Sequence, residues 1–320
     1  MKLGRLALGA AGLLLLVLIV FAMLDEPVSL DLRGAELEDM VFVAGGAFRV
    51  GATLQTVEAF YVDRFEVTER EWARFRKATG RGPLPYWKGL RRDPDDPVRY
   101  VNLQDAKDFA HWKGKELPTN LQWERASQGE GGKRFPWGDG FLLAANTAEL
   151  WEGQVESWGV TRVGTFERGR SAVGAYDMIG NVWEWTRSRT DERLHVTGRV
   201  EEGQGDRFII RGGAFDTPIR GRADLEEAVP ARTRRWDLGF RCVIAEAAYR
   251  RQERIFAALR ELGYRHGWLH GLALKAAERD LVDEGEAALP YLEQAKQRAG
   301  NHPWLQERIQ RIIERIHGGS

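Results

Sequence analysis

Cysteine is almost absent from this chain of 320 residues, where it occurs once, at Cys242. A single thiol excludes a disulfide within the chain and any redox site made of a cysteine pair. It also excludes a zinc site built from several cysteines. We therefore expect Cys242 to be a small, buried, apolar residue.

The chain also lacks net charge, because 47 Lys and Arg residues balance 47 Asp and Glu residues. A basic excess is the electrostatic signature of proteins that bind DNA or RNA, and this chain has none. The composition therefore predicts no nucleic-acid partner. Histidine is scarce as well, and none of the six histidines lies between residues 211 and 222.

Glycine and tryptophan are plentiful, and residues 39–245 contain ten of the 12 tryptophans. Glycines allow tight turns, and large aromatic rings fill a core that has little regular structure around it. Capping boxes at Thr68 and Thr119 predict two short helices, and a third is expected over Asp105–Trp112. Short strands are expected at 47–50, 60–62 and 208–210. This region therefore reads as an α+β domain with much irregular chain.

The N-terminus carries a hydrophobic run, Leu6–Leu24, preceded by Lys2 and Arg5. As a helix the run would be about 28 Å long, close to the thickness of a bilayer core. We predict a transmembrane anchor over residues 1–24 and a linker over 25–38. The preceding positive charges place the main domain on the periplasmic or extracytoplasmic side of the inner (plasma) membrane. A signal peptide cleaved near Ala22, which would release a secreted protein, is the alternative. No cysteine follows the run, so a lipoprotein anchor is excluded.

Residues 246–320 contain little glycine and show helical periodicity. Ile255, Leu259 and Leu262 share one face, and Leu305 begins a similar series. We predict a C-terminal α-helical module. His266 and His270 are one helical turn apart and would share a face, but a third metal ligand is missing, so we expect surface or packing roles.

Several blocks of the middle region resemble the formylglycine-generating enzyme (sulfatase-modifying factor) family, in the family's order. They are residues 40–51, 60–68, 96–98, 114–126, 135–138, 175–186, 211–215 and 239–241. The resemblance implies the family's α+β fold, which is related to C-type lectins, for residues 39–245. It does not extend to residues 246–320.

The resemblance also locates the family's catalytic positions. The founding enzymes carry two cysteines after the Arg-Gly-Gly motif, which bind copper and oxidise a substrate cysteine. Thr217 and Arg222 stand at these positions, and neither is a soft Cu(I) ligand or a thiol nucleophile. We therefore expect no copper and no catalytic residue. The family's substrate region corresponds to Trp183, Arg211, Phe215, Asp216, Thr217 and Arg222.

Calcium is the cofactor that the resemblance implies. Family members bind Ca²⁺ with the loop that matches Asp177–Glu184, through the side chains of Asp177 and Glu184 and the carbonyls of Gly180 and Val182. These are the hard oxygen ligands that calcium prefers. A second site would involve Asn146 and Glu156. The alternative is an Asx-turn at Asp177 and an arginine partner for Glu184.

These observations predict an exported, membrane-anchored, non-catalytic binding or scaffold protein, with an envelope protein or a glycan as its ligand. One alternative is an oxidoreductase or other enzyme with a cysteine-independent active site on the same fold. Another is an envelope-assembly factor that acts through the C-terminal helices.

Overall fold

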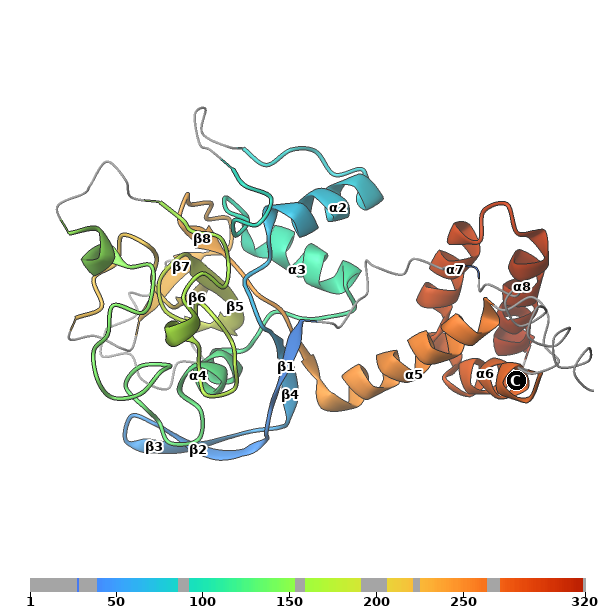
Figure 1. Ribbon diagram of the computed structural model, residues 1–320, viewed down its shortest axis with the longest axis horizontal. Helices are drawn as coiled ribbons and strands as arrows, with labels where there is room; N and C mark the ends of the chain where they lie inside the picture. The colour runs from blue at the N-terminus through green and yellow to red at the C-terminus, as the bar shows by residue number, and fades with distance from the viewer. Residues whose placement is uncertain are drawn as a thin grey trace, which may run out of the picture. The chain divides into compact units, whose positions relative to one another are not determined.

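A computed structural model describes residues 28, 39–85, 92–152, 159–190, 206–220, 225–263 and 271–318 (Figure 1). The chain divides after Tyr249 into a first unit and a second, helical unit. The predicted anchor Leu6–Leu24 lies outside the described residues, as does the linker apart from Val28. Among the residues that are described, no helix has the length and apolar character needed to cross a bilayer.

The first unit contains two small sheets and a hairpin. One sheet has the order β1-β4-β9, with antiparallel strands β1 (Met40–Val43), β4 (Phe60–Asp63) and β9 (Val243–Ala245). The hairpin joins β2 (Gly46–Val50) to β3 (Thr53–Val57). The other sheet has the order β7-β6-β5-β8, from β7 (Glu226–Pro230), β6 (Arg207–Arg211), β5 (Trp183–Arg189) and β8 (Leu238–Gly239). Strands are therefore present at all three places where the sequence predicts them.

Helices α2 (Glu69–Thr79), α3 (Leu103–Trp112) and α4 (Asn120–Gln128) complete the first unit, together with the short 3-10 helices η1 (Ala148–Trp151) and η3 (Glu167–Gly169). The predicted capping boxes at Thr68 and Thr119 are confirmed. Helix α3 begins two residues before the predicted start, because Asn102 forms a third capping box with Asp105. Both α3 and α4 pack against β5, the strand that begins within the predicted calcium loop (Figure 1).

Aromatic rings dominate the core of the first unit. Trp72, Phe75, Phe109 and Phe240 pack together with exposures of 1%, 2%, 1% and 0%. Cys242 is fully buried beside this cluster, which confirms its predicted role as an apolar core residue. Trp72 and Phe75 come from α2 and Phe109 comes from α3, so these two helices supply most of the cluster.

The second unit is helical. It contains most of α5 (Glu246–Leu262), with α6 (Gly271–Asp283), the 3-10 helix η5 (Gly285–Ala287), α7 (Leu289–Arg298) and α8 (Pro303–Gly318). Ile255, Leu259 and Leu262 are buried on one face of α5, and Leu305 and Ile309 are buried on α8, as the periodicity predicts. His266 and His270 lie outside the described residues.

Candidate functional site

Glu184, the second residue of β5, is the centre of a buried ionic cluster. Its two carboxylate oxygens accept hydrogen bonds from Arg241 Nη2 at 2.6 Å and Nε at 2.7 Å. The indole Nε1 of Trp123 donates to the same carboxylate at 2.8 Å. Glu184 and Arg241 are both fully buried. The structure thus contains the arginine partner that the sequence left open as an alternative for Glu184.

Two further carboxylates lie near this pair. Asp177 is 5% exposed, and its Oδ2 accepts a hydrogen bond from the Gly164 backbone N–H at 2.7 Å. Burial raises the pKa of Asp177 to about 6. Burial, and then the charges of Asp177 and Glu184, raise the pKa of Glu66 well above its ordinary value. Three buried carboxyl groups thus lie within the electrostatic influence of one guanidinium, so the cluster has fewer cations than acids, and burial favours the neutral form of Glu66 and Asp177.

This charge balance bears on whether the predicted loop could bind calcium. A divalent cation would balance the excess negative charge, and Asp177 supplies a hard oxygen ligand. In the described part of the chain, no three His, Cys, Asp or Glu side chains are grouped to hold a metal ion. The predicted ligand set would therefore depend on the carbonyls of Gly180 and Val182 as well as Asp177, with Glu184 shared with Arg241. Asp177 and the two carbonyls suit a calcium ion, whereas both oxygens of Glu184 already accept hydrogen bonds from Arg241. The cofactor stays a prediction.

Gly180 brings this loop close to the segment around Asn146. Its φ is +83°, and a Cβ atom there would lie 2.2 Å from the carbonyl oxygen of Asn146, so only glycine fits. The Asn146 side chain is fully buried; its Oδ1 accepts from Trp151 Nε1 at 2.7 Å and its Nδ2 donates to Asn181 Oδ1 at 3.1 Å. Glu156 lies outside the described residues. The second calcium site stays a prediction.

The predicted pocket residues do not all face one surface. Arg211 is 4% exposed; it forms ion pairs with Glu124 and, at 3.1 Å, with Glu226, and it stacks over the Trp123 ring at 4.9 Å. Phe215 is fully buried. Arg211 and Phe215 are thus buried in the protein interior, whereas Asp216 and Thr217 are partly exposed. Arg222 lies outside the described residues.

The loop 217–220 carries the first of the replaced cysteine positions, and it is held in place. Thr217 Oγ1 accepts from the Ala214 backbone N–H at 2.9 Å. A carboxylate oxygen of Glu149, in η1, accepts from the backbone N–H groups of Ile219 at 2.8 Å and Arg220 at 2.6 Å. These hydrogen bonds outweigh burial and lower the pKa of Glu149. Glu149 could not be predicted from the sequence, because nothing in its neighbourhood indicates a partner 70 residues away.

Trp183 is covered by an arginine that was not predicted from the sequence either. Arg235 lies over the Trp183 ring at 5.8 Å, held by Asp237 at 2.6 Å and by Glu227 at 2.8 Å. The next residue, Trp236, is 39% exposed. The only available signal was a tryptophan in an arginine-rich turn, in the segment Arg232–Asp237.

Cys242, the chain's one thiol, cannot serve this region as a nucleophile. It has no solvent exposure. Burial, followed by the nearby Asp63 carboxylate, raises its pKa well above the ordinary value. The thiolate, which is the reactive form, is therefore suppressed.

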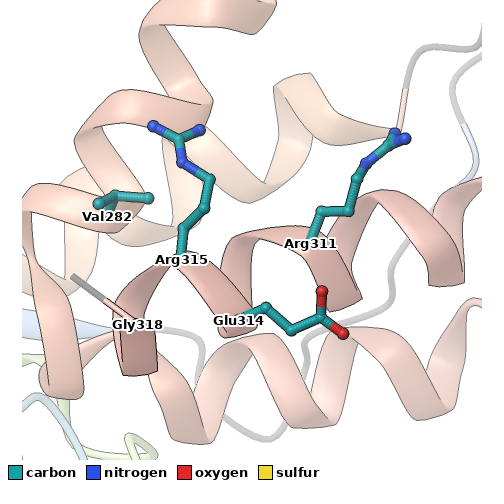
Figure 2. Close-up of a pocket in the computed structure, with 5 residues that line it drawn as sticks. All are labelled: Val282, Arg311, Glu314, Arg315 and Gly318. Carbon is teal, nitrogen blue, oxygen red and sulfur yellow. The ribbon is translucent and has the colours of Figure 1, made fainter.

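The helical unit contains a hollow of about 610 Å³, lined by Val282, Arg311, Glu314, Arg315 and Gly318 (Figure 2). Arg311 and Arg315 extend from one side of α8, and Glu314 points in another direction (Figure 2). None of the sequence-predicted site residues lines this hollow.

Comparisons with known proteins agree with the fold and the sequence blocks. The family model for the sulfatase-modifying factor enzyme 1-like domain matches residues 28–246. The inactive Cα-formylglycine-generating enzyme 2 of Bos taurus is 31% identical over 186 residues, covering 53% of this chain and 58% of the bovine protein. Hercynine oxygenase of Mycolicibacterium thermoresistibile is 30% identical over 223 residues, covering 60% of this chain and 48% of that protein.

The chain thus spans about half the length of these curated relatives. Among solved structures, PvdO from Pseudomonas aeruginosa superposes with a TM-score of 0.52 at 24% identity, covering 64% of this chain and 94% of PvdO. That likeness concerns the fold alone. Because the family model covers well over half of the chain, this protein belongs to the formylglycine-generating enzyme (sulfatase-modifying factor) family.

Proposed function

We propose that this protein is a non-catalytic member of the family, a binding or scaffold protein. The observation that carries the proposal is the state of its only thiol. The founding mechanism needs two cysteines that bind copper, whereas Cys242 is single, fully buried and held as the thiol. No other side chain in the sequence can supply a thiolate.

The replaced positions support the same proposal. The Thr217 hydroxyl accepts a local hydrogen bond, and Glu149 fixes the loop that follows. Arg235 covers one face of Trp183, a ring that the family resemblance places in the substrate region. The name of the bovine relative describes an inactive enzyme, which is in keeping with a family that includes members without catalysis.

The proposal includes the location predicted from the N-terminus. The Leu6–Leu24 run would anchor the chain in the inner membrane and place the family domain on the extracytoplasmic side. There it would meet an envelope protein or a glycan. In this arrangement the anchor confines the domain to a surface, where even a weak ligand interaction gains from a raised effective concentration.

An enzyme with a cysteine-independent site is the second candidate. The observation that favours it is Asp216, a half-buried carboxyl whose pKa is raised by burial and then by Asp237. A raised pKa of this kind is common among catalytic acids. Asp216 is the one observation behind this candidate, whereas the buried Cys242 and the fixed loop after Thr217 both support the binding function.

The experiment that tests the proposal is a thiol-oxidation assay. The full chain, supplied with copper, oxygen and a cysteine-containing sulfatase peptide, should give no formylglycine by mass spectrometry. A catalytically active family member, assayed with the same peptide, serves as the positive control. Product formation above the background given by copper alone would overturn the non-catalytic assignment.

A further inference from the structure

Two dipeptides with the same chemistry lie side by side in the first unit. Phe215 and Trp236 meet edge to face, with ring centroids 4.8 Å apart and an interplanar angle of 75°. Each ring is followed in the chain by an aspartate, Asp216 and Asp237. The two carboxylates are close enough for the charge of Asp237 to raise the pKa of Asp216. Two rings and two acids thus gather from distant parts of the sequence.

One of the two acids already has a cationic partner within the chain. Asp237 binds the Arg235 guanidinium through both oxygens, at 2.9 Å and 2.6 Å, and this guanidinium lies over the Trp183 ring. An arginine held between a carboxylate and an aromatic face is a favourable arrangement for a cation. The protein therefore already contains one site in which an arginine is bound by an aspartate and a tryptophan ring.

The other acid, Asp216, has no such cationic partner among the described residues. Asp216 is half-buried, and within the described residues its carboxylate has no ion pair and no side-chain hydrogen bond. Its own backbone N–H and the more distant Arg235 only partly offset the effects of burial and Asp237. Beside it, Trp236 is 39% exposed, an unusual degree of exposure for so large a ring. Asp216 thus directly follows Phe215, whose ring touches the partly exposed ring of Trp236.

The segment that presents Trp236 is fixed by hydrogen bonds on both sides of it. The backbone N–H of Tyr100 donates to the Arg235 carbonyl at 3.0 Å, and Arg234 donates to the Tyr100 carbonyl at 2.9 Å. The backbone N–H of Trp183 donates to the Asp237 carbonyl at 2.8 Å. Tyr100 has a φ of +62°, a conformation that a non-glycine residue keeps only when its surroundings impose it. Little conformational entropy would therefore be lost when a ligand binds to this surface.

We propose that Asp216 and the exposed part of the Trp236 ring form a receptor for one cationic side chain, a lysine or an arginine, of a protein partner. The proposal rests on the non-catalytic binding function above and specifies the chemistry of its ligand. The partner's cation would lie over the Trp236 ring and pair with Asp216, as Arg235 does with Trp183 and Asp237. One such contact gives only millimolar affinity, so a protein that adds neighbouring contacts is the appropriate occupant.

The test uses the full chain in detergent micelles, labelled with 5-fluorotryptophan and observed by ¹⁹F NMR. Trp236→Phe identifies the signal of Trp236. The probes are blocked tripeptides, Gly-Arg-Gly and Gly-Lys-Gly, with the norleucine tripeptide as the neutral analogue and methyl glucoside as a sugar. We expect the Arg and Lys peptides to shift the Trp236 signal and to saturate it at millimolar concentration. The neutral peptide and the sugar should bind at least about tenfold more weakly than the Arg and Lys peptides.

Two variants separate the contributions, and a third serves as the control. Asp216→Asn should weaken the Arg peptide about tenfold and remove its advantage over norleucine. Trp236→Phe lacks the reporter signal, so its binding is followed through the NMR signals of the peptide. It should retain part of the affinity for the Arg peptide. Phe42→Ala, which removes a ring that is 45% exposed elsewhere, should leave the affinity unchanged. Melting curves establish that each variant is folded.

Three results would overturn the proposal: no shift of the Trp236 signal, equal shifts with norleucine or glucoside, or an unchanged affinity in Asp216→Asn. The thiol-oxidation assay is run on the same preparation. Formylglycine production would reject the non-catalytic function, whereas loss of cation binding without turnover would reject only the receptor.

Discussion

Glu184 and Arg241, 57 residues apart in sequence, form a bidentate ion pair in which the arginine side chain is 0% exposed and the glutamate side chain 1%. The pair joins the start of β5 to the segment before β9. Arg241 also donates to the Tyr176 carbonyl at 2.9 Å, so the pair fixes the loop before β5 as well.

Removal of one partner from this pair should destabilise the protein strongly. Arg241→Met leaves Glu184 buried and uncompensated, and we expect a loss of about 3–5 kcal/mol in the free energy of unfolding. Arg241→Lys should lose less, because the charge stays while the bidentate geometry is lost. Chemical denaturation measures the change. Arg250→Ala, in an exposed pair with Glu253, is the matched control and should cost less than about 1 kcal/mol. Equal losses in Arg241→Met and Arg250→Ala would contradict this account.

Calcium should stabilise the loop from Asp177 to Glu184. An ion that binds only the folded state adds about 2.7 kcal/mol at a hundredfold excess over its Kd. We expect a chelator to lower the melting temperature of the calcium-loaded protein, and added calcium to restore it. Glu184→Gln should largely remove the calcium response, but it also breaks the Arg241 pair.

Asp177→Ala is therefore the better probe, because the Asp177 carboxylate accepts a hydrogen bond from the Gly164 N–H and takes no part in the Glu184–Arg241 ion pair. The variant should show the same melting temperature with and without calcium. Identical curves for the wild-type protein in excess calcium and in chelator would exclude calcium as a structural ligand.

Glu149 should contribute stability that is lost in acid. Its pKa is lowered in the folded protein, so its contribution is complete above the unfolded value near 4.5 and disappears as the pH falls through the folded value. Glu149→Gln should cost about 1.5–3 kcal/mol at neutral pH, because hydrogen bonds to a charged acceptor are lost. The difference from wild type should shrink as the solution is acidified below pH 4.5. Glu152→Gln, on an exposed neighbour, is the control. A difference that does not vary with pH would mean that the charge of Glu149 is unimportant.

The orientation predicted from Lys2, Arg5 and Leu6–Leu24 can be measured with reporters at the C-terminus. An alkaline phosphatase fusion, which needs an oxidising compartment, should be active, and a fluorescent protein that folds only in the cytoplasm should stay dark. Membrane fractionation then distinguishes a retained anchor from cleavage near Ala22. Cytoplasmic reporter activity, with protein inaccessible to external protease, would reject the export of the domain.

Local features of the fold could be predicted from the sequence. The capping boxes at Thr68 and Thr119 involve residues three positions apart, and the buried face of α5 repeats with the helical period. The family blocks located the loop before β5. Contacts between irregular segments could not be predicted: Glu149 with Ile219, Phe215 with Trp236, and Arg235 with Trp183. They join residues far apart in sequence that follow no period, and only the folded chain brings them together.

The hydrogen bonds from Ile219 and Arg220 to Glu149 come from the backbone, and no side chain of the loop 217–220 takes part in them. The exposed positions of the loop, Pro218 and Arg220, can therefore exchange their side chains while the path of the loop stays the same. Substitutions at these positions can therefore change the side chains that the loop displays without affecting the fold beneath it. A library randomised at Pro218 and Arg220, both exposed, should yield mostly folded proteins with new surface chemistry. Loss of an ancestral reactive residue on this loop would then carry little structural penalty, and new recognition properties could accumulate there one substitution at a time.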